Sequence, residues 1–214
     1  MNAKIISKPK RGRGRPKKQA VETLETRELL LRAGMAMLTQ TGFMQSSIDP
    51  ILKSVGVPKG SFYYYFSSKE VFGLAVLARY RRYFEAKLDG FLLDEAFLPL
   101  DRLERFALDA QDGMARHDFK RGCLVGNLEQ ESSLLSEAFQ QALKETYQSW
   151  QSRVASCLRE AEKQTLIAEN SQIDRLSQAF WIGWEGAVHR SRLEKSGEAL
   201  TVFIEFYLGA IRLN

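Results

Sequence analysis

The chain has 214 residues, of which 44% are hydrophobic and 27% are charged, a composition that fits one or two globular domains with a sizeable core. No apolar run approaches the roughly 20 residues that cross a bilayer, and the N-terminus lacks the apolar segment of a secretory signal. With only two cysteines, Cys123 and Cys157, neither a disulfide framework nor a four-thiolate metal site is available. We therefore expect a cytoplasmic protein with free thiols, no metal and no other cofactor.

The net charge of +5 is distributed unevenly along the chain. The first 20 residues contain eight lysines and arginines and no acid, which leaves a net charge of −3 on the rest. Prolines and glycines interrupt this basic segment, and it has too little apolar surface to fold alone. We predict a flexible basic arm at residues 1–20 that meets a polyanion such as DNA. The alternative is a solvated tail without a partner.

Hydrophobic periodicity predicts an N-terminal helix-turn-helix. A first amphipathic helix is expected over residues 23–41. Ser46 or Ser47 suits the N-cap of a short second helix, and Pro58 stands where a third helix begins. Two short helices joined by a three-residue turn that contains glycine are typical of this motif. The DNA-binding domain is therefore predicted at residues 21–67.

The rest of the chain is also predicted to be helical, which makes the fold class all-α. A long helix over residues 68–88 would link the DNA-binding domain to further helices near 100–116, 124–133, 137–163, 172–194 and 197–212. We assign residues 68–214 to an effector-binding and dimerisation domain.

Small and aromatic residues on one face of the last two helices indicate a homodimer interface, with burial inside the monomer as the alternative. They are Leu176, Ala179, Phe180, Gly183, Ala187, Val202, Phe203, Phe206, Tyr207 and Ala210.

Residues 57–70, VPKGSFYYYFSSKE, resemble the recognition helix and following turn of the TetR family of transcriptional repressors. In that arrangement Phe62, Tyr65 and Phe66 pack inward, while an outer set faces the DNA major groove. The outer set is Lys59, Gly60, Ser61, Tyr63 and Tyr64. The resemblance further implies phosphate contacts from Tyr63, Lys69 and Ser46 or Ser47. The alternative is that the aromatic run is simply core.

The basic arm carries a second resemblance to DNA-binding peptides. Arg13-Gly14-Arg15-Pro16 is similar to the core of AT-hook peptides, in which extended arginines enter the narrow minor groove of A·T-rich DNA. On this reading Arg13 and Arg15 contact the groove. A generic basic tail that adds salt-sensitive affinity is the alternative.

Two segments of the body, RGCLVGNL at residues 121–128 and AFWIGWEGA at residues 179–187, are similar to those of acrylate-responsive repressors within the TetR family. The resemblance implies a small effector such as acrylate or a related unsaturated acid. Candidate donors for its carboxylate are His117, Arg121 and Asn127. Trp181, Trp184 and Glu185 are further candidates for the pocket, and ordinary core packing is the alternative for both tryptophans.

The cysteine segment is also similar to that of repressors that sense electrophiles through a cysteine. Cys123 follows a glycine at the expected start of a helix, where the helix dipole and nearby Arg121 and His117 would favour a thiolate. Such a thiolate could add to an activated alkene, whereas an inert buried thiol is the alternative. His189 occupies the position of the sensing lysine, which argues against transfer of that oxidant chemistry.

Together these patterns predict a homodimeric repressor that binds a palindromic double-stranded DNA operator and is released by a small effector. Two other classes of function are alternatives to a repressor. One is a non-specific architectural DNA-binding protein, and the other is an enzyme with Cys123 as nucleophile and His117 or His189 as base. Because the sequence shows no orienting third group and no oxyanion loop, we predict that the protein is not an enzyme.

Overall fold

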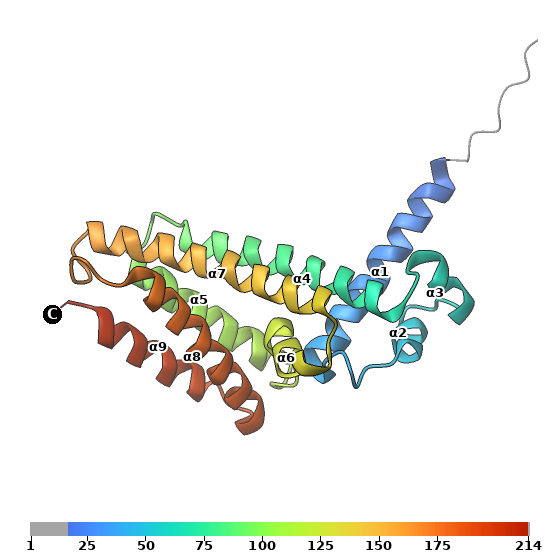
Figure 1. The fold of residues 1–214 in the computed structure, drawn as a ribbon. Coiled ribbons are helices and arrows are strands. Elements are labelled where there is room, and N and C mark those ends of the chain that lie inside the picture. The colour runs from blue at the N-terminus through green and yellow to red at the C-terminus, as the bar shows by residue number, and fades with distance from the viewer. Residues whose placement is uncertain (1–16, 214) are drawn as a thin grey trace, which may run out of the picture.

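The computed structural model describes residues 17–213, with side chains from Thr23 onward (Figure 1). The regular elements of this part of the chain are all helices, and a single isolated β-bridge joins Ile167 to Arg212. The prediction of an all-α fold is confirmed. Its helices are α1 (Lys17–Thr41), α2 (Ile48–Ser54), α3 (Lys59–Tyr65), α4 (Lys69–Leu92), α5 (Pro99–Ala115), α6 (Leu124–Gln130), the 3-10 turn η1 (Ser132–Leu134), α7 (Glu137–Lys163), α8 (Ile173–Glu194) and α9 (Glu198–Ile211). None of these helices has the length and apolar character that a membrane span requires.

Two helix boundaries differ by four or more residues from the sequence-based prediction. The first helix begins at Lys17, inside the segment assigned to the basic arm. Residues 1–16, and with them Arg13 and Arg15, lie outside the described range. The linking helix also continues past Gly90, because the buried side chains of Leu88 and Leu92 hold the next turn against the body. That packing offsets the roughly 1 kcal/mol that a glycine costs inside a helix.

Helices α1, α2 and α3 form a compact unit at one end of the elongated body (Figure 1). They contain the predicted helix-turn-helix and are hereafter called the DNA-binding unit. Ser68 begins α4 as its N-cap, and its hydroxyl accepts a hydrogen bond from the Val71 amide at 3.1 Å. This cap places Phe72 against Phe62 and Phe66, with ring centroids 5.5 and 5.0 Å apart. The unit is therefore anchored to α4 by a small aromatic core.

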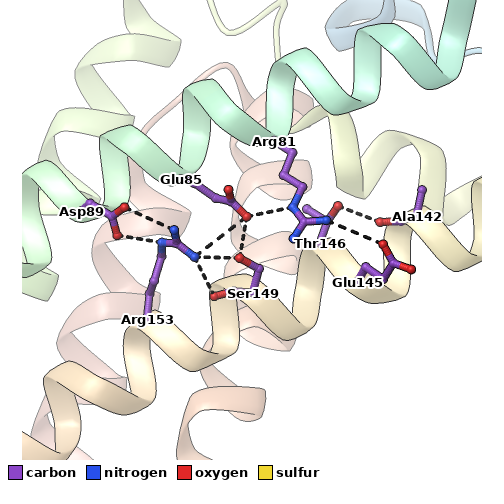
Figure 2. Close-up of polar contacts among 8 residues, drawn as sticks. All are labelled: Arg81, Glu85, Asp89, Ala142, Glu145, Thr146, Ser149 and Arg153. Atoms are coloured by element: carbon purple, nitrogen blue, oxygen red, sulfur yellow. Dashed lines mark hydrogen bonds and ion pairs between the residues drawn. The ribbon is translucent and has the colours of Figure 1, made fainter.

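The rest of α4 runs beside α7, and a seam of charged side chains joins the two helices (Figure 2). Arg153 of α7 donates to both carboxylate oxygens of Asp89, at 2.7 and 3.2 Å. Ser149 of α7 donates to Glu85, which also accepts from Arg81 at 2.8 Å. The half of α4 that lies far from the DNA-binding unit is thus fixed to α7.

An aromatic cluster fills the centre of the body between α4, α5, α7 and α8. Trp150, Trp181 and Trp184 are each at most 2% exposed. Phe106 of α5 is fully buried and stacks on Trp184 with ring centroids 4.7 Å apart. Aromatic side chains bury large apolar areas, so this cluster is expected to contribute strongly to the stability of the body.

Phe106→Ala should lower the free energy of unfolding by about 3–5 kcal/mol, because it removes a fully buried ring and leaves a cavity. Leu108→Ala on the same helix is the matched control, since Leu108 is 50% exposed, and its change should stay within about 0.5 kcal/mol. Urea unfolding followed by circular dichroism measures both. A loss below 1 kcal/mol for Phe106→Ala would contradict the role given to this ring.

Candidate DNA-binding face and effector pocket

Helix α3 separates buried and exposed side chains along its length. Phe62 and the following Phe66 are 1% and 2% exposed, whereas Tyr63 and Tyr64 are 60% and 59% exposed. Tyr65 is only half-buried, so the inward position predicted for it is only partly realised. The core thus fixes the helix while two tyrosines project outward.

The remaining predicted groove-facing residues lie at the start of α3. Lys59 and Gly60 are exposed and Ser61 is half-buried. No atom lies within 4 Å of where a Cβ on Gly60 would stand, so the backbone is open to close approach there. Lys59 pairs with Asp49 of α2 at 3.0 Å, and both side chains are more than half exposed. Exposed pairs of this kind are weak, so the ammonium can exchange Asp49 for a phosphate or a base edge.

Some of the residues predicted to contact phosphate are accessible, and others already bind a partner within the protein. Ser47 is exposed at the N-cap of α2 and makes no side-chain cap. Ser46 is buried, and its hydroxyl donates to the carbonyl of Phe43 at 2.8 Å, which leaves Ser47 as the better phosphate ligand. Lys69 stands at the start of α4 with its ammonium 4.5 Å above the ring of Phe43, where partial burial lowers its pKa.

A cavity of about 300 Å³ lies between α1, α4, α5 and α8. Four predicted effector residues line it, namely His117, Arg121, Cys123 and Trp184. Five cationic side chains and no carboxylate are among its lining residues. The cations are Arg32, Arg79, Lys87, Arg116 and Arg121. This cavity, hereafter the cationic pocket, is therefore suited to a small anion with an apolar body.

The other predicted effector residues lie elsewhere. Trp181 and Glu185 line a second cavity of about 380 Å³ between α7 and α8, together with Tyr147, Glu129 and others. Its lining residues include one cation, Lys144, and the acid Glu129, so this cavity is less suited to a carboxylate than the cationic pocket. The sequence could not separate the two sets, because Trp181 and Trp184 are neighbours on α8 that point to different cavities.

Asn127 does not line either cavity, contrary to the prediction that it donates to an effector. Its amide donates to the carbonyls of Leu38 and Thr39 at the end of α1, both at 3.0 Å. Its carbonyl accepts from Arg192 of α8 at 2.9 Å, and Arg192 also donates to Gln40 at 2.7 Å. Asn127 is buried among these partners, so it ties α6 and α8 to α1 instead of facing a ligand.

Glu131, just after α6, makes a second connection to the DNA-binding unit. Its carboxylate accepts from the backbone amides of Phe43 and Met44, at 2.8 and 3.1 Å, in the loop between α1 and α2. No local pattern indicates this contact, because it joins residues almost 90 positions apart. Through Asn127 and Glu131, the short α6 holds both the end of α1 and the loop that follows.

The surroundings of Cys123 favour the inert buried thiol over the thiolate. The side chain is 4% exposed, and burial together with nearby Glu185 raises the pKa of its thiol well above the usual range. The hydroxyl of Tyr80 donates to its sulfur at 3.7 Å. Arg121 lies 3.4 Å from a ring nitrogen of His117 and is only half-buried, so its charge does not offset the desolvation of the thiol.

Glu185 is a buried carboxyl group in the middle of α8. It is 6% exposed, and neither carboxylate oxygen has a hydrogen-bond partner among the described residues. Burial raises its pKa to about 8, so the group is largely neutral at pH 7. Gly126 of α6 lies directly against this carboxyl, and a Cβ at that position would overlap it. The close approach of α6 to α8 therefore depends on glycine at position 126.

Arg79 and Arg32 are pocket residues that the sequence analysis missed. They come from α4 and α1, far in the sequence from the predicted donors His117, Arg121 and Asn127. The one available signal was the position of Arg79 itself, a charged residue next to the buried positions Val76 and Tyr80 of α4. Within residues 17–213 no cluster of three or more histidine, cysteine or acidic side chains could hold a metal ion.

An exposed third helix on a three-helix unit, carried by a long helix that enters a helical body, is the architecture of a helix-turn-helix regulator. The family of bacterial regulatory proteins of the TetR type matches residues 30–76, and the tetracyclin repressor-like C-terminal domain matches residues 99–207. The chain belongs to the TetR family and is a TetR-type transcriptional regulator.

Individual relatives cover nearly the whole chain. The transcriptional regulator AcuR of Cereibacter sphaeroides is 45% identical over 199 residues, which are 93% of this chain and 90% of that protein. The repressor NemR of Escherichia coli is 28% identical over 82% of this chain and 88% of its own length.

Solved structures agree with this assignment. A regulatory protein TetR from Rhodobacter sphaeroides has a TM-score of 0.84 and 44% identity, covering 86% of this chain and 97% of that one. The reduced form of Escherichia coli NemR has a TM-score of 0.79 and 28% identity, covering 88% and 97%.

Glu185→Gln should stabilise the protein at neutral pH. Between the ordinary pKa of 4.5 and the folded value of about 8, only the folded chain holds the proton, so the wild type loses stability as pH rises through this window. The loss at pH 7 amounts to about 3 kcal/mol relative to pH 4. Urea unfolding at pH 5 and pH 7.5 should show a gap between variant and wild type that widens with pH. An equal gap at both values would refute the raised pKa.

Cys123 should resist alkylation in the folded protein. In a Cys157→Ser background, iodoacetamide at pH 7.5 should label Cys123 at least about 100-fold more slowly than the urea-unfolded chain, because the thiol is buried and protonated. Mass spectrometry of quenched samples gives both rates. Labelling as fast as in the unfolded chain would restore the reactive-thiolate interpretation.

Proposed function

We propose that the protein is a homodimeric repressor that covers a near-palindromic double-stranded DNA operator and is released by a small unsaturated carboxylate such as acrylate. The observation that carries the DNA-binding part is the exposure of Lys59, Tyr63 and Tyr64 on a helix anchored by buried Phe62 and Phe66. Two copies of α3 would enter successive major grooves about 34 Å apart. Relatives named as repressors support negative regulation.

Exposed apolar side chains on α8 and α9 support the dimer. Ile182, Leu193 and Phe206 are 77%, 77% and 78% exposed, and Val202 is 56% exposed. Large exposed apolar side chains grouped on two helices are typical of an interface between subunits. Several residues predicted for this interface instead pack inside the monomer, where α8 meets α9. These are Phe180, Ala187 and Tyr207, which are buried, and Gly183, which packs against Phe203.

The cationic pocket supports a small carboxylate as effector. Its volume of about 300 Å³ is at the small end for ligand sites. Trp184 and Tyr80 supply apolar walls, and His117 and Arg121 supply donors near its rim. Acrylate itself is the effector implied by the similarity of residues 121–128 and 179–187 to acrylate-responsive repressors.

A cysteine-based sensor of electrophiles is the second candidate, favoured by the position of Cys123 on the wall of the same pocket. The raised pKa of its thiol argues for reversible binding instead of adduct formation. Non-specific architectural binding is the remaining alternative, and it predicts equal affinity for any DNA sequence.

Fluorescence anisotropy should show specific binding to DNA from upstream of the protein's own gene and release of that DNA by acrylate. Cys123→Ser should respond like the wild type, because reversible binding needs no thiolate. Intact-protein mass should show no adduct. Release of the wild type alone, together with an added mass of one acrylate, would establish the covalent sensor instead.

Tyr64→Ala separates specific from non-specific binding. We expect a loss of operator affinity of about 10-fold or more with an unchanged melting temperature, because the side chain is exposed. Leu24→Ala on α1, 67% exposed, is the matched surface control and should leave both values unchanged. If scrambled DNA binds as tightly as the upstream DNA, the protein is architectural and the repressor proposal fails.

A further inference from the structure

A carboxylate shared by two arginines lies where the cationic pocket meets the DNA-binding unit. Glu28 of α1 accepts from Arg79 of α4, with the Nε and Nη2 atoms at 2.8 and 2.5 Å from the same carboxylate oxygen. Arg32 donates to that oxygen as well, at 3.1 Å. One carboxylate therefore serves two guanidinium groups, and both of these groups line the pocket.

The balance of charge at this point favours a second anion. Arg32 and Arg79 share one acid, and Arg116 and Arg121 add further positive charge to the lining of the pocket. Lys87 is already paired with Asp109. Planar guanidinium groups bind carboxylates through two parallel hydrogen bonds, a geometry that Arg79 does not achieve with Glu28, since both contacts fall on one oxygen.

We infer, resting on the proposed carboxylate effector, that Arg79 is its anion-binding residue and that the ligand carboxylate replaces Glu28 on Arg79 when it binds. The exchange is possible because the Arg79 side chain is 20% exposed and faces the pocket, while that of Glu28 is 41% exposed and can turn to solvent. The ligand class is a small monocarboxylate whose apolar part lies against Trp184 and Tyr80.

The exchange connects the pocket to the operator through α1. With Glu28 bound, the middle of α1 is held against α4, and with ligand bound this tie is lost. The carboxyl end of α1 stays attached to Asn127 and Arg192, so α1 turns about that end. Because α2 packs on α1, the spacing of the two α3 helices in a dimer changes.

The size of the effect follows from the weakness of a partly exposed ion pair. Loss of such a pair changes the equilibrium between the DNA-binding and released conformations of one protomer by about 5-fold. Because both protomers of a dimer exchange the pair, operator affinity would fall by the square of that factor, about 25-fold. This magnitude is enough for regulation without requiring large structural change.

Glu28→Gln separates the exchange from a purely structural role. Removal of the competing acid should tighten the binding of sodium acrylate about 3- to 10-fold in isothermal titration calorimetry, while operator affinity without ligand falls. Glu25→Gln, the same charge change one turn earlier on α1 at an exposed position, is the matched control for general electrostatics toward DNA. It should leave acrylate binding unchanged.

Arg79 variants test the other side of the pair. Arg79→Met should reduce acrylate affinity at least about 10-fold and abolish release, and Arg79→Lys should retain part of the affinity because it keeps the charge without the paired donors. Neutral acrylamide, which has nearly the same shape, should show no binding to the wild type. Thermal melting followed by circular dichroism confirms that each variant folds. If Arg79→Met does not fold, Arg79→Lys is used for the comparison.

The outcomes distinguish this exchange from the effector proposal on which it rests. If acrylate releases the wild type but Glu28→Gln binds acrylate no more tightly, the exchange is wrong and the effector stands. If acrylate does not bind the wild type, the effector proposal fails and the exchange fails with it. Tighter binding by Glu28→Gln together with lost binding by Arg79→Met supports both.

Discussion

The buried stripe of α4 is the constraint on which the rest of the structure depends. Its inward side chains recur every four residues, so one helix supplies core to both ends of the molecule. Phe72 and Val76 pack in the DNA-binding unit, whereas Tyr80, Phe84 and Leu88 pack in the body. A displacement of α4 in the body is therefore transmitted to the helix-turn-helix without any flexible linker between them.

The two halves of α4 are held by different kinds of contact. Near α7 it is fixed by a network of several ionic and hydrogen-bonding side chains, including Arg153 with Asp89 (Figure 2). Near α1 it is fixed by the aromatic core around Phe62 and by the pair of Arg79 with Glu28. The pocket meets the DNA-binding unit at Arg79, so the exchange proposed above would act on an ionic contact and leave the aromatic packing in place.

Polar groups in the body are buried at a cost that hydrogen bonding only partly offsets. Glu185 and the indole nitrogens of Trp150 and Trp181 have no partner among the described residues. Groups of this kind destabilise a core unless they are paired, so they are often found where a ligand or a functional change requires them. Trp181 and Glu185 line the cavity between α7 and α8, so a molecule bound there would lie against two residues with unpaired polar atoms.

The sequence by itself determined the helices and the DNA-binding motif, because periodicity, caps and the residues of α3 are local properties of the chain. Glycine and proline placed the turns around α2 and α3, and the alternation of buried Phe62 with exposed Tyr63 and Tyr64 was readable from helical spacing alone. The family followed from the same local motif, which explains why it could be recognised before any contact was known.

Only the tertiary structure decided the chemistry of the body. Asn127 and Arg121 both looked like ligand donors, yet one is used by the end of α1 and the other lines a pocket. Cys123 looked activated by its place at a helix start, but burial by α4 and α8 raises the pKa of its thiol. Arg79 and Glu28 are 51 residues apart, so their pairing had no local signal. The environment of a side chain is set by elements distant in the sequence, and local pattern cannot supply it.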